Sequence, residues 1–105
     1  MNVLFDQGVP VPIRQSLTKH TVATAYELGW EKLQNGDLLN AAEQKGYQVL
    51  VTTDQNLKYQ QNLQSRKISI VVLLSANWPK IRPKIDAVVL AIDSVVSGSY
   101  TEVPI

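Results

Sequence analysis

Cysteine is absent from this chain of 105 residues, which excludes disulfide bonds and cysteine-based zinc sites. No apolar run approaches the roughly 20 residues that a membrane-spanning helix needs, so we expect no membrane partner. The first six residues lack a basic segment followed by a long apolar one, and we therefore expect no signal peptide. Together these absences predict a cytoplasmic protein.

The chain also has almost no excess of charge of either sign. The formal net charge is +1 at pH 7, from 10 Lys and Arg residues and 9 Asp and Glu residues. This balance creates no global field to attract nucleic acid, so any RNA binding must rest on a local cluster. Lys58 and Arg14 are the preferred candidates because they lie near the acidic edge described below. The single histidine, His20, follows Lys19 at a predicted helix end, where a cation is favoured, and we assign it no catalytic role.

Strand-like and helix-like segments alternate along the chain. Strands are predicted across 2–6, 20–26, 48–53, 68–74 and 101–105. Helices are predicted after Pro10, between Asp37 and Gly46, across 55–64, and between Trp78 and Gly98. The alternation indicates βαβ units joined by right-handed crossovers. We therefore predict an α/β fold, a three-layer sandwich with a small, mostly parallel sheet of four or five strands.

Three aspartates occupy positions that this arrangement would bring together. Asp6 ends the first apolar run, Asp54 ends the run that begins at Val49, and Asp37 opens a helix. The carboxyl ends of parallel strands meet at one edge, where open α/β sheets place their active sites. Clustered carboxylates repel one another, and a hard divalent cation such as Mg²⁺ is the usual physical remedy. We predict that these three aspartates share a pocket as catalytic and metal-binding residues.

Each aspartate, taken alone, also has a structural interpretation. Asp37 would be a good N-cap whatever the function, and we predict that it caps its helix. Asp6 and Asp54 could be turn residues that bond their own backbone. Their joint placement at one predicted edge favours the functional interpretation.

The motifs around these aspartates resemble those of a known family. The segment Asp37-Leu38-Leu39-Asn40-Ala41-Ala42, followed by Val49-Leu50-Val51-Thr52-Thr53-Asp54, is similar to the second half of PIN domains, including VapC-type toxins. Leu4-Phe5-Asp6 resembles their first strand. The short chain and the proline-rich turn after Asp6 resemble a compact PIN-like family of uncharacterised bacterial proteins, which often begin Leu-Phe-Asp-Glu-Asn-Leu-Pro.

This resemblance implies a single PIN-like domain over residues 1–105 and a metal-dependent endoribonuclease, often the toxin of a toxin–antitoxin pair. By that likeness Asp6, Asp37 and Asp54 hold Mg²⁺ or Mn²⁺, and Thr52 orders the loop before Asp54 by hydrogen bonding. The implied partners are RNA, a protein antitoxin and a second copy of the chain.

The chain departs from the family pattern next to the first aspartate. Gln7 and Gly8 replace the Glu-Asn of the compact family, and a carboxamide can coordinate a metal but cannot act as a base. PIN nucleases usually have a further glutamate before the helix-opening aspartate. Here Glu27 is the candidate for that fourth carboxylate, whereas Glu31, beside Lys32, is interpreted as a surface residue.

Three functions are weighed against these residues. The first is metal-assisted hydrolysis of RNA phosphodiester bonds, which needs no side-chain nucleophile. The second is a catalytically inactive module that binds RNA or a protein partner, which Gln7 favours. The third, a receiver-like phosphoacceptor at Asp54, ranks last because it needs a second acid beside Asp6 and a lysine after a late strand.

The last predicted helix is more apolar than one sheet face requires. Its apolar residues are Ile81, Ile85, Val88, Val89, Ile92, Val95 and Val96. Surplus apolar surface on a small domain often marks a contact with another chain, which predicts a homodimer or an antitoxin interface. The alternative is that the fold itself buries this helix.

Overall fold

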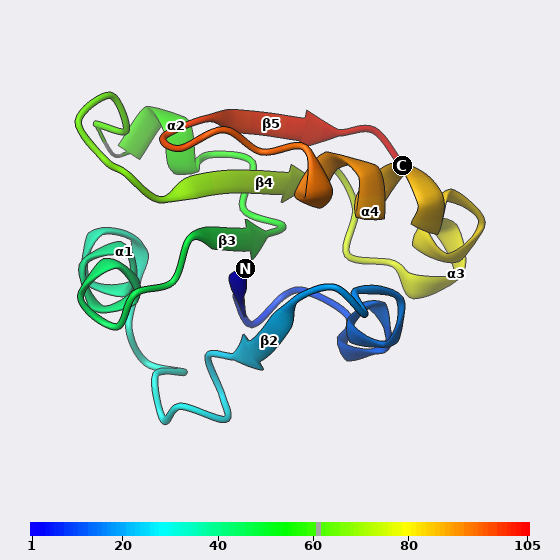
Figure 1. Cartoon of the computed structure of the whole chain (residues 1–105), viewed down its shortest axis with the longest axis horizontal. Coiled ribbons are helices and arrows are strands. Elements are labelled where there is room, and N and C mark those ends of the chain that lie inside the picture. Colours follow the sequence, from blue (N-terminus) through cyan, green and yellow to red (C-terminus); the bar gives the residue numbers. More distant parts are fainter. Residues whose placement is uncertain (61) are drawn as a thin grey trace.

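The computed structural model describes residues 1–60 and 62–105 and contains a five-stranded, entirely parallel sheet (Figure 1). The strands are β1 (Asn2–Phe5), β2 (Thr21–Thr24), β3 (Val49–Thr52), β4 (Ser69–Leu73) and β5 (Tyr100–Val103). They are arranged in the order β2-β1-β3-β4-β5, one of the two common orders of doubly wound α/β folds. The predicted α/β class with a small parallel sheet is confirmed.

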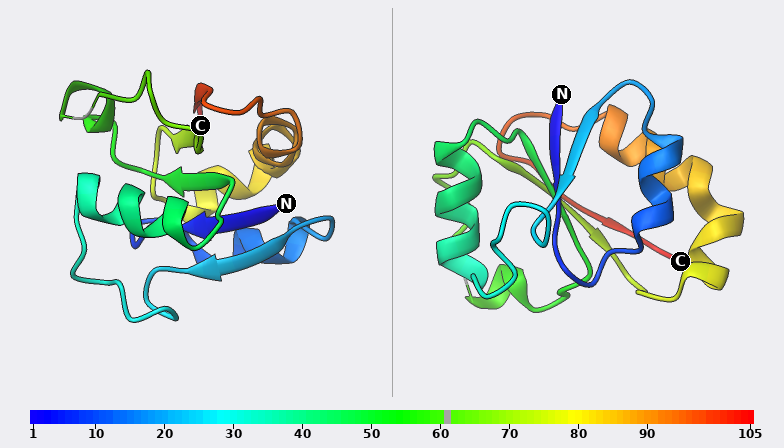
Figure 2. Two further views of the ribbon diagram at one scale, coloured as in Figure 1. Left: turned by 60° about the vertical axis from the view of Figure 1, so that its left-hand side comes forward. Right: turned by 90° about the horizontal axis from the view of Figure 1, so that it is seen from below.

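Helical segments cover both faces of this sheet. They are η1 (Val11–Ser16), α1 (Asn35–Gln44), α2 (Leu57–Gln60), α3 (Trp78–Ile81), η2 (Arg82–Lys84) and α4 (Ile85–Asp93), of which η1 and η2 are 3₁₀ helices. The right-hand view of Figure 2 shows α1 on one side of the sheet and η1, α3 and α4 on the other. The helices and the sheet thus form three layers. Part of the helix expected across 55–64 falls on residue 61, outside the described residues.

The central strands β1, β3 and β4 are buried on both faces of the sheet, and neighbouring side chains of each strand point to opposite sides. Val3 and Phe5 of β1 belong to the core under η1 and α4, whereas Leu4 belongs to the core under α1. The central strands β3 and β4 are buried at every position, which explains their continuous apolar runs. Helix α4 contributes Val88 and Ile92 to the first core.

Helix α1 begins earlier than predicted, and the assignment of Asp37 as its N-cap is wrong. Gln34 has the extended backbone of a cap residue, and its carbonyl oxygen accepts the backbone N–H groups of Asp37 at 3.0 Å and Leu38 at 3.4 Å. Asp37 therefore lies inside the first turn. An acidic side chain is still favoured there, because the N-terminus of a helix carries partial positive charge.

The last predicted helix is broken rather than continuous. Proline lacks a backbone N–H and clashes with the preceding turn, and η2, which contains Pro83, interrupts the segment between α3 and α4. Helix α4 ends at Asp93, so Val95 and Val96 lie in the turn before β5. Most of the apolar stripe is buried or half-buried within the fold, and Val96 remains exposed.

The connections between strands do not all have the same hand. The connections β1–β2 and β4–β5 pass over the same face, since η1 and α4 share one core, but they run toward opposite edges of the sheet. Two such connections on one face necessarily have opposite hands. The expectation that every crossover is right-handed is therefore wrong for one of them.

No helix in the described part of the chain is both long enough and apolar enough to span a membrane.

Candidate functional site

The carboxyl ends of β1 and β3 lie side by side, and the chain leaves them in opposite directions. Phe5 is paired with Val51 in the sheet, Asp6 directly follows β1, and Asp54 lies two residues beyond β3. The chain after β1 runs to η1 on one face, and the chain after β3 runs to α2 on the other. Such a divergence opens a crevice at the sheet edge, the usual ligand site of open α/β sheets.

A buried hydroxyl group connects the two aspartates across this crevice. Thr52 is 1% exposed, and its Oγ1 donates a hydrogen bond to Asp6 Oδ2 at 2.8 Å. The same oxygen accepts the backbone N–H of Asp54 at 3.1 Å. The predicted role of Thr52 in ordering the chain before Asp54 is thus seen directly. Its hydroxyl fixes both the side chain of Asp6 and the backbone of Asp54.

Backbone amides orient the two carboxylates further. The N–H of Gln7 donates to Asp6 Oδ1 at 2.8 Å, and the N–H of Asn56 donates to Asp54 Oδ1 at 2.9 Å in an Asx turn. The backbone N–H of Asp6 continues the sheet by bonding Val51 O at 2.9 Å. A carboxylate has about four lone-pair sites, so Asp6, with one bond at each oxygen, keeps acceptor capacity for a cation.

Both aspartates line one cavity of about 370 Å³, here named the acidic cavity. Its lining residues are Asp6, Gln7, Glu31, Leu33, Gln34, Asn35, Leu38 and Asp54. Three carboxylates and three side-chain amides therefore contribute to its wall. Glu31, interpreted from the sequence as a surface residue, contributes to the acidic wall, and no sequence motif marked it.

Asp37 is the predicted site residue that the structure does not bring to this cavity. It is exposed and is not among the lining residues. Because α1 begins at Asn35, the residues just before and at the helix start line the cavity in its place. Among residues 1–60 and 62–105, no three acidic or histidine side chains come close enough to hold a metal ion jointly. The expectation of three aspartates in one pocket thus reduces to Asp6 and Asp54.

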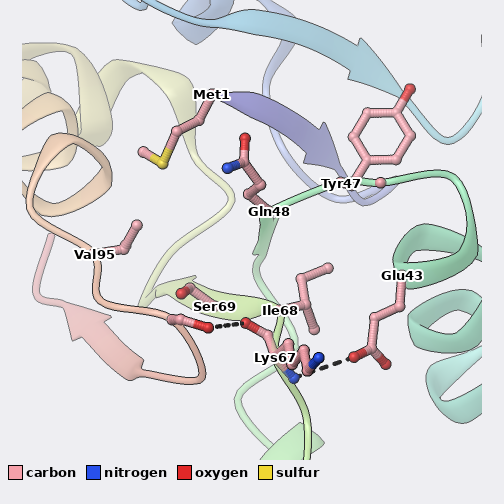
Figure 3. A pocket seen from close by; sticks show the side chains of 10 residues that line it. Met1, Glu43, Tyr47, Gln48, Lys67, Ile68, Ser69 and Val95 are labelled. Atoms are coloured by element: carbon pink, nitrogen blue, oxygen red, sulfur yellow. Dashed lines mark hydrogen bonds between the residues drawn. The ribbon is translucent and has the colours of Figure 1, made fainter.

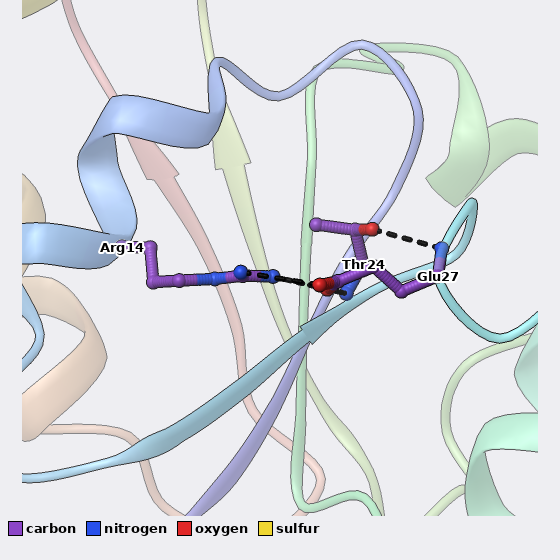
Figure 4. Close-up of polar contacts among 3 residues, drawn as sticks. All are labelled: Arg14, Thr24 and Glu27. Atoms are coloured by element: carbon purple, nitrogen blue, oxygen red, sulfur yellow. Dashed lines mark hydrogen bonds and ion pairs between the residues drawn. The ribbon is translucent and has the colours of Figure 1, made fainter.

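Glu27, the candidate fourth carboxylate, is engaged elsewhere (Figure 4). Arg14 donates to both of its carboxylate oxygens, at 3.2 Å to Oε2 and in a shorter contact to Oε1. The backbone N–H of Thr24 also donates to Oε1, at 2.9 Å. The hydrogen bond from Arg14, with that from Thr24, lowers the pKa of Glu27 below its usual value of 4.5. Glu27 is thus a paired anion rather than a free metal ligand.

A second cavity of about 410 Å³ lies on the other side of Asp6 and is named here the Tyr26 cavity. Its lining residues are Asp6, Gln7, Val9, Val11, Arg14, Thr24, Tyr26 and Glu27. Asp6 and Gln7 line both cavities, so the two cavities meet at the end of β1.

Gly8 allows the chain after β1 to pack closely on the chain after β3. A Cβ atom at this position would lie 2.3 Å from Thr53 Oγ1, so the Thr53 side chain would have to move. The close approach of the two segments therefore explains why a glycine, rather than the asparagine of the family pattern, stands at position 8. This glycine brings the segment that carries Asp6 against the segment that carries Asp54.

A further cavity, of about 340 Å³, lies at the opposite edge of the sheet (Figure 3). Met1, Gln48 and Ser69, near the amino ends of β1, β3 and β4, contribute to its wall. Glu43 reaches it from α1 and accepts the backbone N–H of Lys67 at 3.2 Å. None of the predicted site residues lines this cavity.

The chain matches no known protein-family model, no curated protein and no solved structure. The geometry at the carboxyl ends of β1 and β3 is therefore the basis for a functional assignment.

Proposed function

We propose that this protein is a metal-dependent endoribonuclease in which Asp6 and Asp54 hold Mg²⁺ or Mn²⁺. One observation carries the proposal: two aspartates from neighbouring parallel strands line one cavity, and the buried hydroxyl of Thr52 connects them. They lie in the crevice where doubly wound sheets bind ligands. The motifs that resemble PIN domains surround the same two residues.

The donor set fits a magnesium ion. Mg²⁺ prefers oxygen ligands, keeps several of its waters, and is usually held by one or two protein carboxylates together with substrate phosphates. Asp6 and Asp54 supply two carboxylates, and the carboxamide oxygen of Gln7 is a third oxygen at the same cavity. Two protein carboxylates therefore suffice, although among the described residues no third acidic side chain comes close enough to share the ion with them.

The residues of the chain have distinct roles in this proposal. A divalent cation supplies charge stabilisation at phosphorus and lowers the pKa of water. Asp6 and Asp54 bind the cation, and Thr52 holds Asp6 in one orientation. The two basic side chains predicted to contact RNA both form ion pairs within the chain. Arg14 pairs with Glu27, and Lys58 pairs with Glu102 at 3.0 Å. This pairing limits their attraction for phosphate.

The direct test is cleavage of single-stranded RNA in the presence of Mg²⁺ or Mn²⁺. We expect Asp6→Asn and Asp54→Asn each to lower kcat/KM by more than the roughly 10- to 100-fold that loss of a hydrogen-bonding partner of a metal ligand costs. Asp86→Asn is the matched control, because Asp86 is exposed on α4 and lines neither cavity at Asp6. Equal activity of all three variants, or cleavage that persists in EDTA, would contradict the proposal.

A second candidate is a module that binds RNA or a protein partner without turnover. The observation that favours it is that no third acid joins Asp6 and Asp54 within the part of the chain the structure describes. Under this candidate, RNA binds to the purified protein but remains intact with every divalent cation. The cleavage assay, run beside a binding assay, separates the two candidates.

We also propose the two protein partners that the family resemblance implies, an antitoxin and a second copy of the chain. If the chain is a toxin, its expression should arrest growth unless a partner protein is expressed with it. Leu90 of α4 and the nearby Val96 keep much of their apolar surface exposed and are the residues to expect in a homodimer or antitoxin interface. Light scattering at micromolar concentration tests the homodimer, and a monomer at that concentration argues against it.

A further inference from the structure

The Tyr26 cavity combines apolar surface with a neutralised charge pair. Two large apolar side chains that remain exposed, Val11 at 54% and Tyr26 at 74%, line this one cavity. Val9 lies beside them and is buried. Hydrolysis at the acidic cavity uses none of these side chains. Their convergence next to Asp6 points to a ligand with an uncharged ring.

The polar wall of the Tyr26 cavity fits the same kind of ligand. Arg14 and Glu27 form a two-pronged ion pair, so their charges cancel locally (Figure 4). The bonds from Thr24 N–H to Glu27 and from Glu27 N–H to Thr24 Oγ1, at 2.9 and 3.1 Å, hold the pair in place. The neutralised pair attracts a phosphate weakly, and the polar groups of this wall can offer hydrogen bonds to the edge of a flat heterocycle.

We propose that the Tyr26 cavity binds one base of the RNA strand whose phosphate lies at Asp6 and Asp54, with the Tyr26 ring stacked on that base. The proposal rests on the proposed ribonuclease function and specifies its substrate. Since Asp6 and Gln7 line both cavities, a nucleotide that spans them places its phosphate at the acidic cavity and its base at the Tyr26 cavity. Proteins bind unstacked bases on aromatic rings, and a base inside a duplex cannot be reached in this way. The substrate class is therefore single-stranded RNA.

The test compares RNA binding by three variants with the wild-type protein. The probe is a fluorescently labelled single-stranded oligoribonucleotide of mixed sequence. Its binding is followed by anisotropy with Ca²⁺, which takes oxygen ligands as Mg²⁺ does, and gel electrophoresis verifies that the probe stays intact. Tyr26→Ala should weaken binding by about 5- to 150-fold, the range expected for the loss of one base–aromatic stack. Tyr26→Phe retains the ring and should bind like the wild type. Tyr59→Ala is the matched control, because Tyr59 is 78% exposed but lines neither cavity at Asp6.

Folding does not confound this comparison, because the Tyr26 side chain is largely exposed and its removal leaves the core intact. A blunt duplex of the same sequence should bind more weakly than the single strand. If Tyr26→Ala binds and cleaves RNA as the wild type does, the base site is wrong and the ribonuclease function stands. If the wild type neither binds RNA in this assay nor cleaves it with Mn²⁺, the ribonuclease function fails and the base site fails with it.

Discussion

Replacing Thr52 by valine removes the hydroxyl that connects the two aspartates and leaves the shape of the side chain almost unchanged. Two hydrogen bonds are lost, one to the Asp6 carboxylate and one from the Asp54 backbone N–H. A bond to a charged group contributes about 1.5–3 kcal/mol and a neutral one about 0.5–1.5 kcal/mol. Asp6 is only half-buried, so water replaces part of the first bond. We therefore expect Thr52→Val to lower the free energy of unfolding by about 1–3 kcal/mol.

The loss is large enough to measure by two independent methods. In a domain of this size, 1 kcal/mol shifts Tm by roughly 4–8 °C, so the melting temperature should fall by on the order of 5–20 °C. Urea denaturation followed by circular dichroism gives the free energy directly. The second readout is Mn²⁺ affinity, which should weaken by about 10- to 100-fold because Asp6 is no longer held in orientation.

Thr52→Ser is the control that separates packing from hydrogen bonding. Serine keeps the hydroxyl and loses one buried methyl group, which lowers stability by about 1 kcal/mol. It should retain the Mn²⁺ affinity of the wild type within about threefold, because the hydroxyl still orients Asp6. The reasoning is refuted if Thr52→Val is as stable as the wild type, or if valine and serine weaken Mn²⁺ binding equally.

Three further predictions concern helix electrostatics, pH and backbone geometry. Asp37→Asn should lower the free energy of unfolding by about 0.3–1 kcal/mol, because α1 loses the anion at its N-terminus. RNA cleavage should stay unchanged, and a loss of cleavage would show that Asp37 belongs to the active site. Lys58 bonds Glu102 and lowers its pKa below the usual 4.5, so the contribution of Glu102 to stability is present above pH 4.5 and disappears as the pH falls through the lowered pKa. The urea midpoints of the wild type and Glu102→Gln should therefore differ at pH 7 and converge in more acidic buffer, and a constant difference would contradict this account. Gly98→Ala should lower the free energy of unfolding by about 1–3 kcal/mol in urea denaturation, because φ is +76° and the new Cβ would lie 2.9 Å from a backbone oxygen. Gly29→Ala, at φ +73° with no such neighbour, should cost less. Equal costs would show that the close backbone oxygen contributes nothing.

Much of the fold follows from local patterns in the sequence. The runs that became β3 and β4 are apolar throughout, because both faces of these strands are buried, and helical segments between the strands imply parallel pairing. The positions of Asp6 and Asp54 follow as well, since each lies at or just beyond the end of such a run. Parallel strands place their carboxyl ends at one edge, so the meeting of these two residues needed only the order of elements.

Tertiary packing decided the features that depend on residues far apart in the chain. Arg14 pairs with Glu27, and Thr52 bonds Asp6 across 46 positions, although the neighbours of these residues in sequence do not specify either contact. The N-cap of α1 is Gln34, three residues before the predicted Asp37, and at about 100° of rotation per residue such a shift redirects a side chain around the helix. For that reason Asp37 lies outside the acidic cavity. Periodicity encodes which segments form helices and strands, but the close packing of distant segments determines which side chains finally share a cavity.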